Sequence, residues 1–318
     1  MPAVEPPQAG VLQGGWFVRQ LDSLFVLRPT LIFPLWTMIL AGCNLAKGRQ
    51  PLGWQPWTLF AIGLTGMFGL VYLLNQMRDQ KTDAINQKLF LVSEGAINRR
   101  HQHIETAVLV LLAVVSFTFS GKGLLALWVV GLFLLIGVLY NFTPLTLKQR
   151  PWGGLITYAV SGWMFVRLGE MIYHASVPFV KELPYVVAFV ASCLLTNLPD
   201  IEGDRAAGKR TFTVAYGIRA SLVCGAVGFG LALIGGLVNG DLLILIPSLL
   251  TFPFMVAAAA RSSIELSVAA NKWAIFLLSI AVGVAFPAYI IAIAVYYPVA
   301  RWYYKQRMGL AYPTFKGK

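Results

Sequence analysis

Long apolar stretches recur along the chain, and they constrain its fold more than any other feature. A helix needs about 20 mostly apolar residues to cross the hydrocarbon core of a bilayer. With 58% hydrophobic and 12% charged residues, the chain is too apolar for an ordinary soluble domain. The sequence predicts an all-α integral membrane protein, a bundle of nine transmembrane helices. The nine stretches lie near residues 30–47, 55–76, 104–120, 123–141, 154–173, 183–198, 219–239, 242–260 and 272–298.

Two flanking segments differ in character from the helical domain, residues 30–300. Residues 1–29 begin with a proline-rich lead-in and continue as GGWFVRQLDSLFVLRPT, whose aromatic and basic side chains suit the membrane interface. Residues 301–318 form a basic tail. We therefore expect one helical domain between an interfacial N-terminal segment and a basic C-terminal tail.

Basic residues are concentrated in alternate connections between the predicted helices. The connections after the second, fourth, sixth and eighth helices carry most of them, whereas the opposite connections hold only Lys47, Arg49, Lys122 and Lys181. The positive-inside rule places the basic connections in the cytoplasm. If the protein is prokaryotic, we expect it in the plasma membrane. The basic charge of the tail conflicts with a count of nine spans, because nine spans would put the tail outside. Either the tail overrides a weak charge bias between the two sides, or one span is miscounted. The net charge of +12 fits membrane lipids, with no need for nucleic acid.

Two acidic clusters stand at the ends of apolar stretches on the same predicted side. In the first, Asp79 and Asp83 are four residues apart, so a helix that runs past the bilayer places both on one face, with Asn75 one turn below. The second, NLPDIEGD, repeats the interval. Mg²⁺ is usually held by one or two carboxylates together with substrate phosphates. Loop acids that balance basic neighbours are the alternative, but the repeated interval favours metal and diphosphate. The predicted metal ligands are Asn75, Asp79, Asp83, Asp200 and Asp204.

A third group of side chains follows the fourth apolar stretch, on the same side. The sequence LYNFTPLTLKQRP places Tyr140, Lys148 and Arg150 there. Fixed positive charge lowers the barrier when a diphosphate leaves. A tyrosine can donate a hydrogen bond or stabilise a cation with its ring face. The alternative is an interfacial tyrosine beside an ordinary basic connection.

Together, NQMRDQKTDAIN, YNFTPLTLKQR and DIEGDRAAGKRTFTVAYG resemble the intramembrane UbiA-type prenyltransferase superfamily. The resemblance implies a central cavity, open toward the membrane, in which Mg²⁺ holds an isoprenyl diphosphate donor between two Asp motifs. It also implies transfer of the isoprenyl group to a lipophilic acceptor, most commonly an aromatic quinone precursor, by residues 30–300. Catalytic roles are implied for Asp79, Asp83, Asp200, Asp204, Tyr140 and Lys148. Substrate contacts are expected from Asn75, Asn197, Lys81, Arg78, Lys88, Arg150 and Arg167.

The chain departs from many family members just after the first motif. Their pattern NxPxRPxPSG corresponds to NQKLFLVSEG at residues 86–95, where Phe90 replaces the arginine and both later prolines are lost. Lys88, Lys81 or Arg78 then supplies the missing charge. This difference bears on the acceptor and on diphosphate binding, but not on the metal site.

Arg167 and Glu170 are charged residues within the fifth apolar stretch, three residues apart on one helical face. Charges at membrane depth usually face the protein interior and pair with one another. One interpretation is a buried ion pair. The other is that these side chains line the acceptor pocket, with His174 beside them.

Two other functions stay open from the sequence. A terpene cyclase on the same scaffold would use the same acidic clusters without an acceptor. A cation-coupled secondary transporter would place its acids near the bilayer midplane, whereas the acids here stand at helix ends on one side.

Overall fold

The computed structural model describes residues 12–46, 54–85, 91–93 and 95–316, and every regular element in these ranges is a helix. The helix α6 (Gly123–Phe133) continues directly as the π-helix η1 (Leu134–Leu139). The main elements are α3 (Pro29–Leu45), α4 (Trp54–Ile85), α5 (Arg99–Ser120), α6 (Gly123–Phe133), η1 (Leu134–Leu139), α7 (Pro151–Ile172), α8 (Phe179–Thr196), α10 (Phe212–Asn239), α11 (Leu242–Arg261), α12 (Ile264–Ala285) and α13 (Pro287–Met308). The short elements are α1 (Trp16–Gln20), α2 (Asp22–Phe25), η2 (Leu147–Gln149), η3 (Leu198–Asp200) and α9 (Ile201–Ala206).

The outer faces of the helices are suited to lipid. Among the described residues, seven helical segments are long and apolar enough to cross a membrane, and the apolar segment Gly123–Leu139 is shorter. Large apolar side chains face outward, such as Leu111 on α5 at 63% exposure and Leu237 on α10 at 67%. Extended apolar surface of this kind is buried by lipid or by a partner. The chain is therefore a multi-pass membrane protein, with seven clear spans where nine were predicted.

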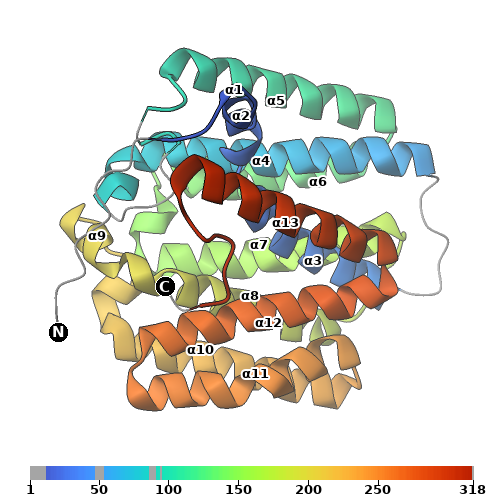
Figure 1. The fold of residues 1–318 in the computed structure, drawn as a ribbon. Helices are drawn as coiled ribbons and strands as arrows, with labels where there is room; N and C mark the ends of the chain where they lie inside the picture. The colour runs from blue at the N-terminus through green and yellow to red at the C-terminus, as the bar shows by residue number, and fades with distance from the viewer. Residues whose placement is uncertain (1–11, 47–53, 86–90, 94, 317–318) are drawn as a thin grey trace.

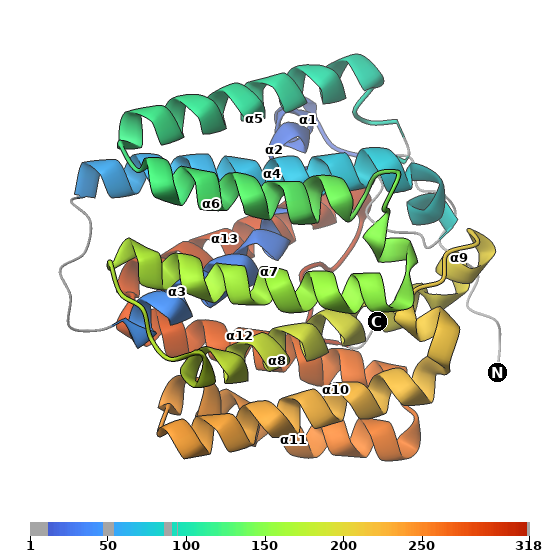
Figure 2. The same ribbon diagram turned by 180° about the vertical axis from the view of Figure 1, so that it is seen from behind.

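The helices lie side by side in a bundle, with α5 at one edge and α10 and α11 at the other (Figures 1 and 2). Extensive contacts join α4 to α5, α3 to α7 and α8 to α10. The short helix α9 contacts α4 and lies near its C-terminal end (Figure 1). The fold thereby brings the two acidic motifs to the same end of the bundle.

The predicted single span at residues 272–298 is wrong, because this region belongs to two helices. α12 ends at Ala285 and α13 begins at Pro287, and Phe286 between them has φ −129° and ψ 78°. Proline disfavours the helical conformation in the residue before it, which accounts for the break. Because α13 runs back along the bundle, its C-terminal end lies at the same end of the bundle as α9 (Figure 1). The basic tail therefore joins the other basic connections, and residues 301–308 of it belong to α13.

The helices α3 and α7 cross at close range because each has a glycine at the crossing. A Cβ atom on Gly42 would overlap the carbonyl oxygen of Val166, and one on Gly169 would overlap the carbonyl oxygen of Ile39. Small residues allow helix backbones in a membrane to approach in this way. Both helices line the cavity described below, so the crossing sets the spacing between two of its walls.

The last helix, α13, is fastened to the N-terminal segment and to α3. Asp22 of α2 and Arg307 of α13 form a buried ion pair, with Arg307 Nη2 2.9 Å from Asp22 Oδ2. Tyr303 donates a hydrogen bond of 2.6 Å to the same carboxylate. On α3, Thr30 Oγ1 lies 2.6 Å from Tyr296 Oη. α13 thus covers α3 on the face of the bundle shown in Figure 1.

Candidate active site

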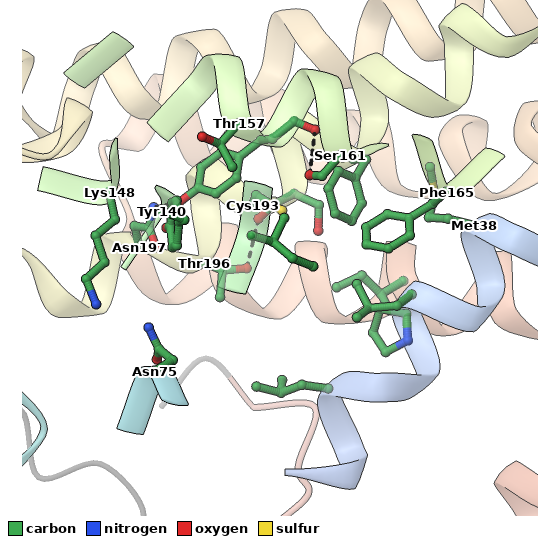
Figure 3. Close-up of a pocket in the computed structure, with 18 of the residues that line it drawn as sticks. Met38, Asn75, Tyr140, Lys148, Thr157, Ser161, Phe165, Cys193, Thr196 and Asn197 are labelled. Carbon is green, nitrogen blue, oxygen red and sulfur yellow. Dashed lines mark hydrogen bonds between the residues drawn. The ribbon is translucent and has the colours of Figure 1, made fainter. Parts of the chain in front are cut away.

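A cavity of about 380 Å³ lies among the helices of the bundle. Figure 3 shows Asn75 and Lys148 at one end of it, and Met38 and Phe165 at the other. A cavity that is charged at one end and apolar along the rest suits a molecule with an ionic head and a hydrocarbon tail. Apolar lining residues include Leu31, Leu35, Val71, Phe189, Phe229 and Leu278.

The first acidic motif lies on α4, which continues beyond its apolar part for a total of 32 residues. Asn75, Asp79 and Asp83 therefore share one face, as predicted, and all three line the cavity. Lys148 donates a hydrogen bond of 2.7 Å to Asp79, and Arg28 Nη2 lies 3.7 Å from Asp83 Oδ2. Burial lowers the pKa of Lys148, while the nearby Asp79 carboxylate opposes this shift. Each carboxylate thus faces a cation from another part of the chain.

The second acidic motif lies just after α8. Asp200 ends the 3₁₀ turn η3 and Asp204 lies in α9, and both line the cavity. Lys209 follows α9, and its amine lies 3.2 Å from Asp204 Oδ1 and 3.5 Å from Asp79 Oδ1. One lysine therefore connects the two motifs.

A pair of tyrosines adjoins the charged end of the cavity. Tyr140 Oη lies 2.8 Å from Tyr158 Oη, and Asn197 donates a hydrogen bond of 2.9 Å to Tyr158. All three side chains line the cavity, and Figure 3 shows Tyr140 next to Lys148. Phenol groups and aromatic faces thus lie where the charged part of the cavity meets the apolar part.

Three predicted substrate contacts lie away from this cavity. Arg78 and Arg150 are exposed and are not among the residues that line it. Arg167 lies in α7, where its Nη1 is 2.6 Å from Glu170 Oε2 and 2.9 Å from Glu182 Oε1. This arrangement agrees with the ion-pair interpretation of Arg167 and Glu170.

The remaining predicted contacts, Lys88 and the side chain of Lys81, lie outside the described residues. Arg28, Tyr158 and Lys209 also line the cavity, and none of them was predicted as a site residue. Lys209 had a signal in the sequence, because it follows Asp204 by five residues in DRAAGK. Arg28 and Tyr158 reach the site only through the packing of α3 and α7.

A profile of the UbiA prenyltransferase family matches residues 34–280, which is more than half of the chain. The chain belongs to the UbiA prenyltransferase family. This family member is 29% identical over 233 residues to the bacteriochlorophyll synthase 34 kDa chain of Chloroflexus aurantiacus, covering 68% of this chain and 69% of that one. It is 26% identical over 218 residues to a probable homogentisate phytyltransferase 2 of Oryza sativa, covering 61% of this chain and only 55% of the plant protein.

Solved structures show the same fold. A UbiA homolog from Archaeoglobus fulgidus matches this UbiA-family chain with a TM-score of 0.62 at 17% identity, over 86% of this chain and 98% of that one. The same homolog bound to GPP and Mg²⁺ matches with a TM-score of 0.59 at 17% identity, over 81% and 99%. Membership of the family, rather than this likeness of fold, makes the chain a membrane prenyltransferase. Its α13 begins after the end of the family match.

The charged end of this UbiA-family cavity has the chemistry of a shared metal site. Its carboxylates and the Asn75 amide oxygen are the hard oxygen ligands that Mg²⁺ prefers. Among the described residues, no three His, Cys, Asp or Glu side chains are close enough to hold a metal ion by themselves. The Lys209 amine already places positive charge between Asp79 and Asp204. The residues thus fit a cation held jointly by a few carboxylates and a ligand phosphate.

Proposed function

We propose that this prenyltransferase transfers an isoprenyl group from an isoprenyl diphosphate to a lipophilic aromatic acceptor, in a reaction that requires Mg²⁺. The supporting observation is the convergence of two carboxylate motifs and two lysines at one end of an otherwise apolar cavity. Carboxylates hold divalent cations, and lysines bind phosphate as point charges. The apolar walls suit the isoprenyl chain.

The first chemical step separates the isoprenyl group from its diphosphate. The bond between C1 and the diphosphate oxygen breaks, and the electron pair leaves with the diphosphate. Mg²⁺ held by the carboxylates would supply positive charge that stabilises this leaving group. Lys148 and Lys209 both reach the carboxylates of these motifs. From there they would donate hydrogen bonds to the leaving oxygens. The ring of Tyr140 lies beside Lys148, where its face stabilises the allylic cation.

The second step joins the cation to the acceptor. Water would capture an allylic cation, and the apolar side chains that line most of the cavity disfavour water there. A nucleophilic atom of the acceptor forms the new bond to C1. The proton that the acceptor loses passes to a carboxylate or to the released diphosphate.

The two relatives described above suggest two acceptor classes, and one experiment separates them. Protein in lipid nanodiscs is incubated with labelled geranylgeranyl diphosphate and Mg²⁺, together with either a phenolic quinone precursor or a chlorophyllide-type tetrapyrrole. We expect a prenylated phenol with Mg²⁺ and none with a chelator. Prenylation of the tetrapyrrole alone would contradict the aromatic acceptor and indicate a tetrapyrrole acceptor, as the name of the Chloroflexus relative suggests. Cyclised hydrocarbon formed without any acceptor would identify a terpene cyclase and refute the proposal.

We also propose that the charged end of the bundle faces the cytoplasm. The support is the positive-inside rule, because the basic connections and the basic tail lie at this end. Glu265, exposed in the first turn of α12, offers a site for a test. In a background without the three native cysteines, a Glu265→Cys variant should react with a membrane-impermeant maleimide in inverted vesicles and not in intact cells. The opposite labelling pattern would overturn this orientation.

A further inference from the structure

The π-helix η1 ends beside the active site, and its last turn creates two unusual backbone acceptors. The Tyr140 amide donates to the carbonyl oxygen of Leu135, five residues back, at 3.0 Å. The carbonyl oxygens of Ile136 and Gly137 accept from the side chain of Asn141 instead, at 3.0 and 3.1 Å. Single turns of π-helix occur frequently at functional sites.

These two hydrogen bonds fix the orientation of the Asn141 amide. Because Nδ2 donates both of its protons to the backbone, Oδ1 must point the other way, into the site. There Oδ1 accepts from Asn75 Nδ2 at 2.7 Å and from Lys148 Nζ at 2.9 Å. The side chain of Asn141 is fully buried, at 0% exposure, so water does not compete for any of these bonds.

The same network determines how Asn75 presents its own amide. Asn75 Nδ2 donates to Asn141 Oδ1 and, at 3.2 Å, to Asp79 Oδ2. Both amide protons are therefore used, which leaves the Asn75 carbonyl oxygen as the atom that can act as a ligand. Lys148 is held between Asn141 and Asp79 by its two hydrogen bonds. One buried side chain thus orients a candidate metal ligand and a candidate diphosphate donor together.

We propose that Asn141 is a positioning residue, which acts through Asn75 and Lys148 to set the geometry for binding a divalent cation and diphosphate. This inference rests on the proposed function, since it concerns the same site. Asn141 makes no contact with reacting atoms in this role. Partners that orient metal ligands in this manner are typically worth roughly 10–100-fold in metal affinity or activity.

The test measures binding as well as turnover, in the full-length protein. Mn²⁺ serves as the probe cation, followed by electron paramagnetic resonance, with inorganic diphosphate as the probe anion. Asn141→Leu keeps the approximate size of the side chain but removes every hydrogen bond. We expect roughly 10–100-fold weaker Mn²⁺ binding in the presence of diphosphate, and a fall of similar size in kcat/KM. Asn141→Ser, whose hydroxyl can still bond a carbonyl one turn back, should retain part of the affinity. Should Asn141→Leu fail to fold, the partial loss in Asn141→Ser carries the test.

A double-mutant cycle with Lys148→Ala distinguishes positioning from a structural role. If Asn141 works through Lys148, the loss of Mn²⁺–diphosphate binding free energy in the double variant is smaller than the sum of the losses in the two single variants. Leu145→Ala, at an exposed position in the same connection, is the matched control and should bind as the wild type does. Wild-type affinity in Asn141→Leu, or full additivity with Lys148→Ala, would overturn the inference while leaving the proposed function standing. Failure of the wild type to bind Mn²⁺ with diphosphate would overturn both.

Discussion

Replacing Asp204 with asparagine should lower the rate of isoprenyl transfer roughly 10²–10³-fold, as removal of one preorganised stabilising group typically does. Asp204 is buried, lines the cavity and lies 3.2 Å from Lys209. The asparagine side chain has the same shape but lacks the negative charge that attracts both the lysine and a divalent cation. The measurement is the initial rate of product formation in nanodiscs at fixed donor and Mg²⁺ concentrations.

Glu202 provides the matched control for this variant. It lies in the same short helix, but it is exposed and is not among the cavity residues. Glu202→Gln removes the same charge from the same helix and should keep the wild-type rate. Equal losses in the two variants would mean that the net charge of this surface is what matters. An undiminished rate in Asp204→Asn would contradict the assignment of α9 to the active site.

Replacing Arg307 with methionine should lower the free energy of unfolding by about 3–5 kcal/mol, because a buried carboxylate loses its cation. Arg307 bonds both oxygens of Asp22 and donates to the carbonyl oxygen of Gln13 at 2.9 Å. Tyr303, whose ring stacks on Phe25 with centroids 3.8 Å apart, also donates to Asp22 but carries no charge. The measurement is denaturant unfolding in detergent, followed by tryptophan fluorescence.

Two further variants show whether the pair itself is responsible. Asp22→Leu combined with Arg307→Met removes both charges and should recover most of the lost stability, since apolar replacement of a whole buried pair is often neutral. Arg301→Met changes an exposed arginine on the same helix and should cost little. If Arg307→Met is as stable as the wild type, α13 is not held to the N-terminal segment by this ion pair.

The first motif could be located from the sequence because its spacing equals one helical turn. Asn75, Asp79 and Asp83 share a face of any helix that continues through them, whatever surrounds it. The second motif was predicted to meet the first because both follow apolar stretches on one side. That reasoning needed only helix length and direction, and the contact between α4 and α9 agrees with it.

The break between α12 and α13 was missed because hydropathy is nearly continuous across it. Residues 272–298 are apolar on both sides of Phe286, so a window average cannot separate a long span from two shorter helices. The signal was Pro287, which sets a helix boundary through its local sterics. The conflict between nine spans and a basic tail was a second signal, because α13 brings the tail to the end of the bundle that carries the other basic connections.

The partners of the acidic motifs could not be predicted, since they depend on tertiary packing. Arg28 meets Asp83 because α3 begins beside the end of α4. The role of Asn141 depends on a π-turn, which shifts the backbone hydrogen bonds of η1 by one residue. Hydrophobic patterning carries no information about such a shift. Residues that orient a site are therefore harder to find from sequence than the ligands themselves.

The central proposal is tested most directly by a structure of the protein with Mg²⁺ and a non-reactive isoprenyl thiodiphosphate. We predict that the diphosphate binds between the α4 and α9 motifs, within hydrogen-bond distance of Lys148 and Lys209. Its isoprenyl chain should extend past Tyr140 toward Phe165. Diphosphate bound elsewhere on the protein, or at this site without contact to either lysine, would contradict the proposal.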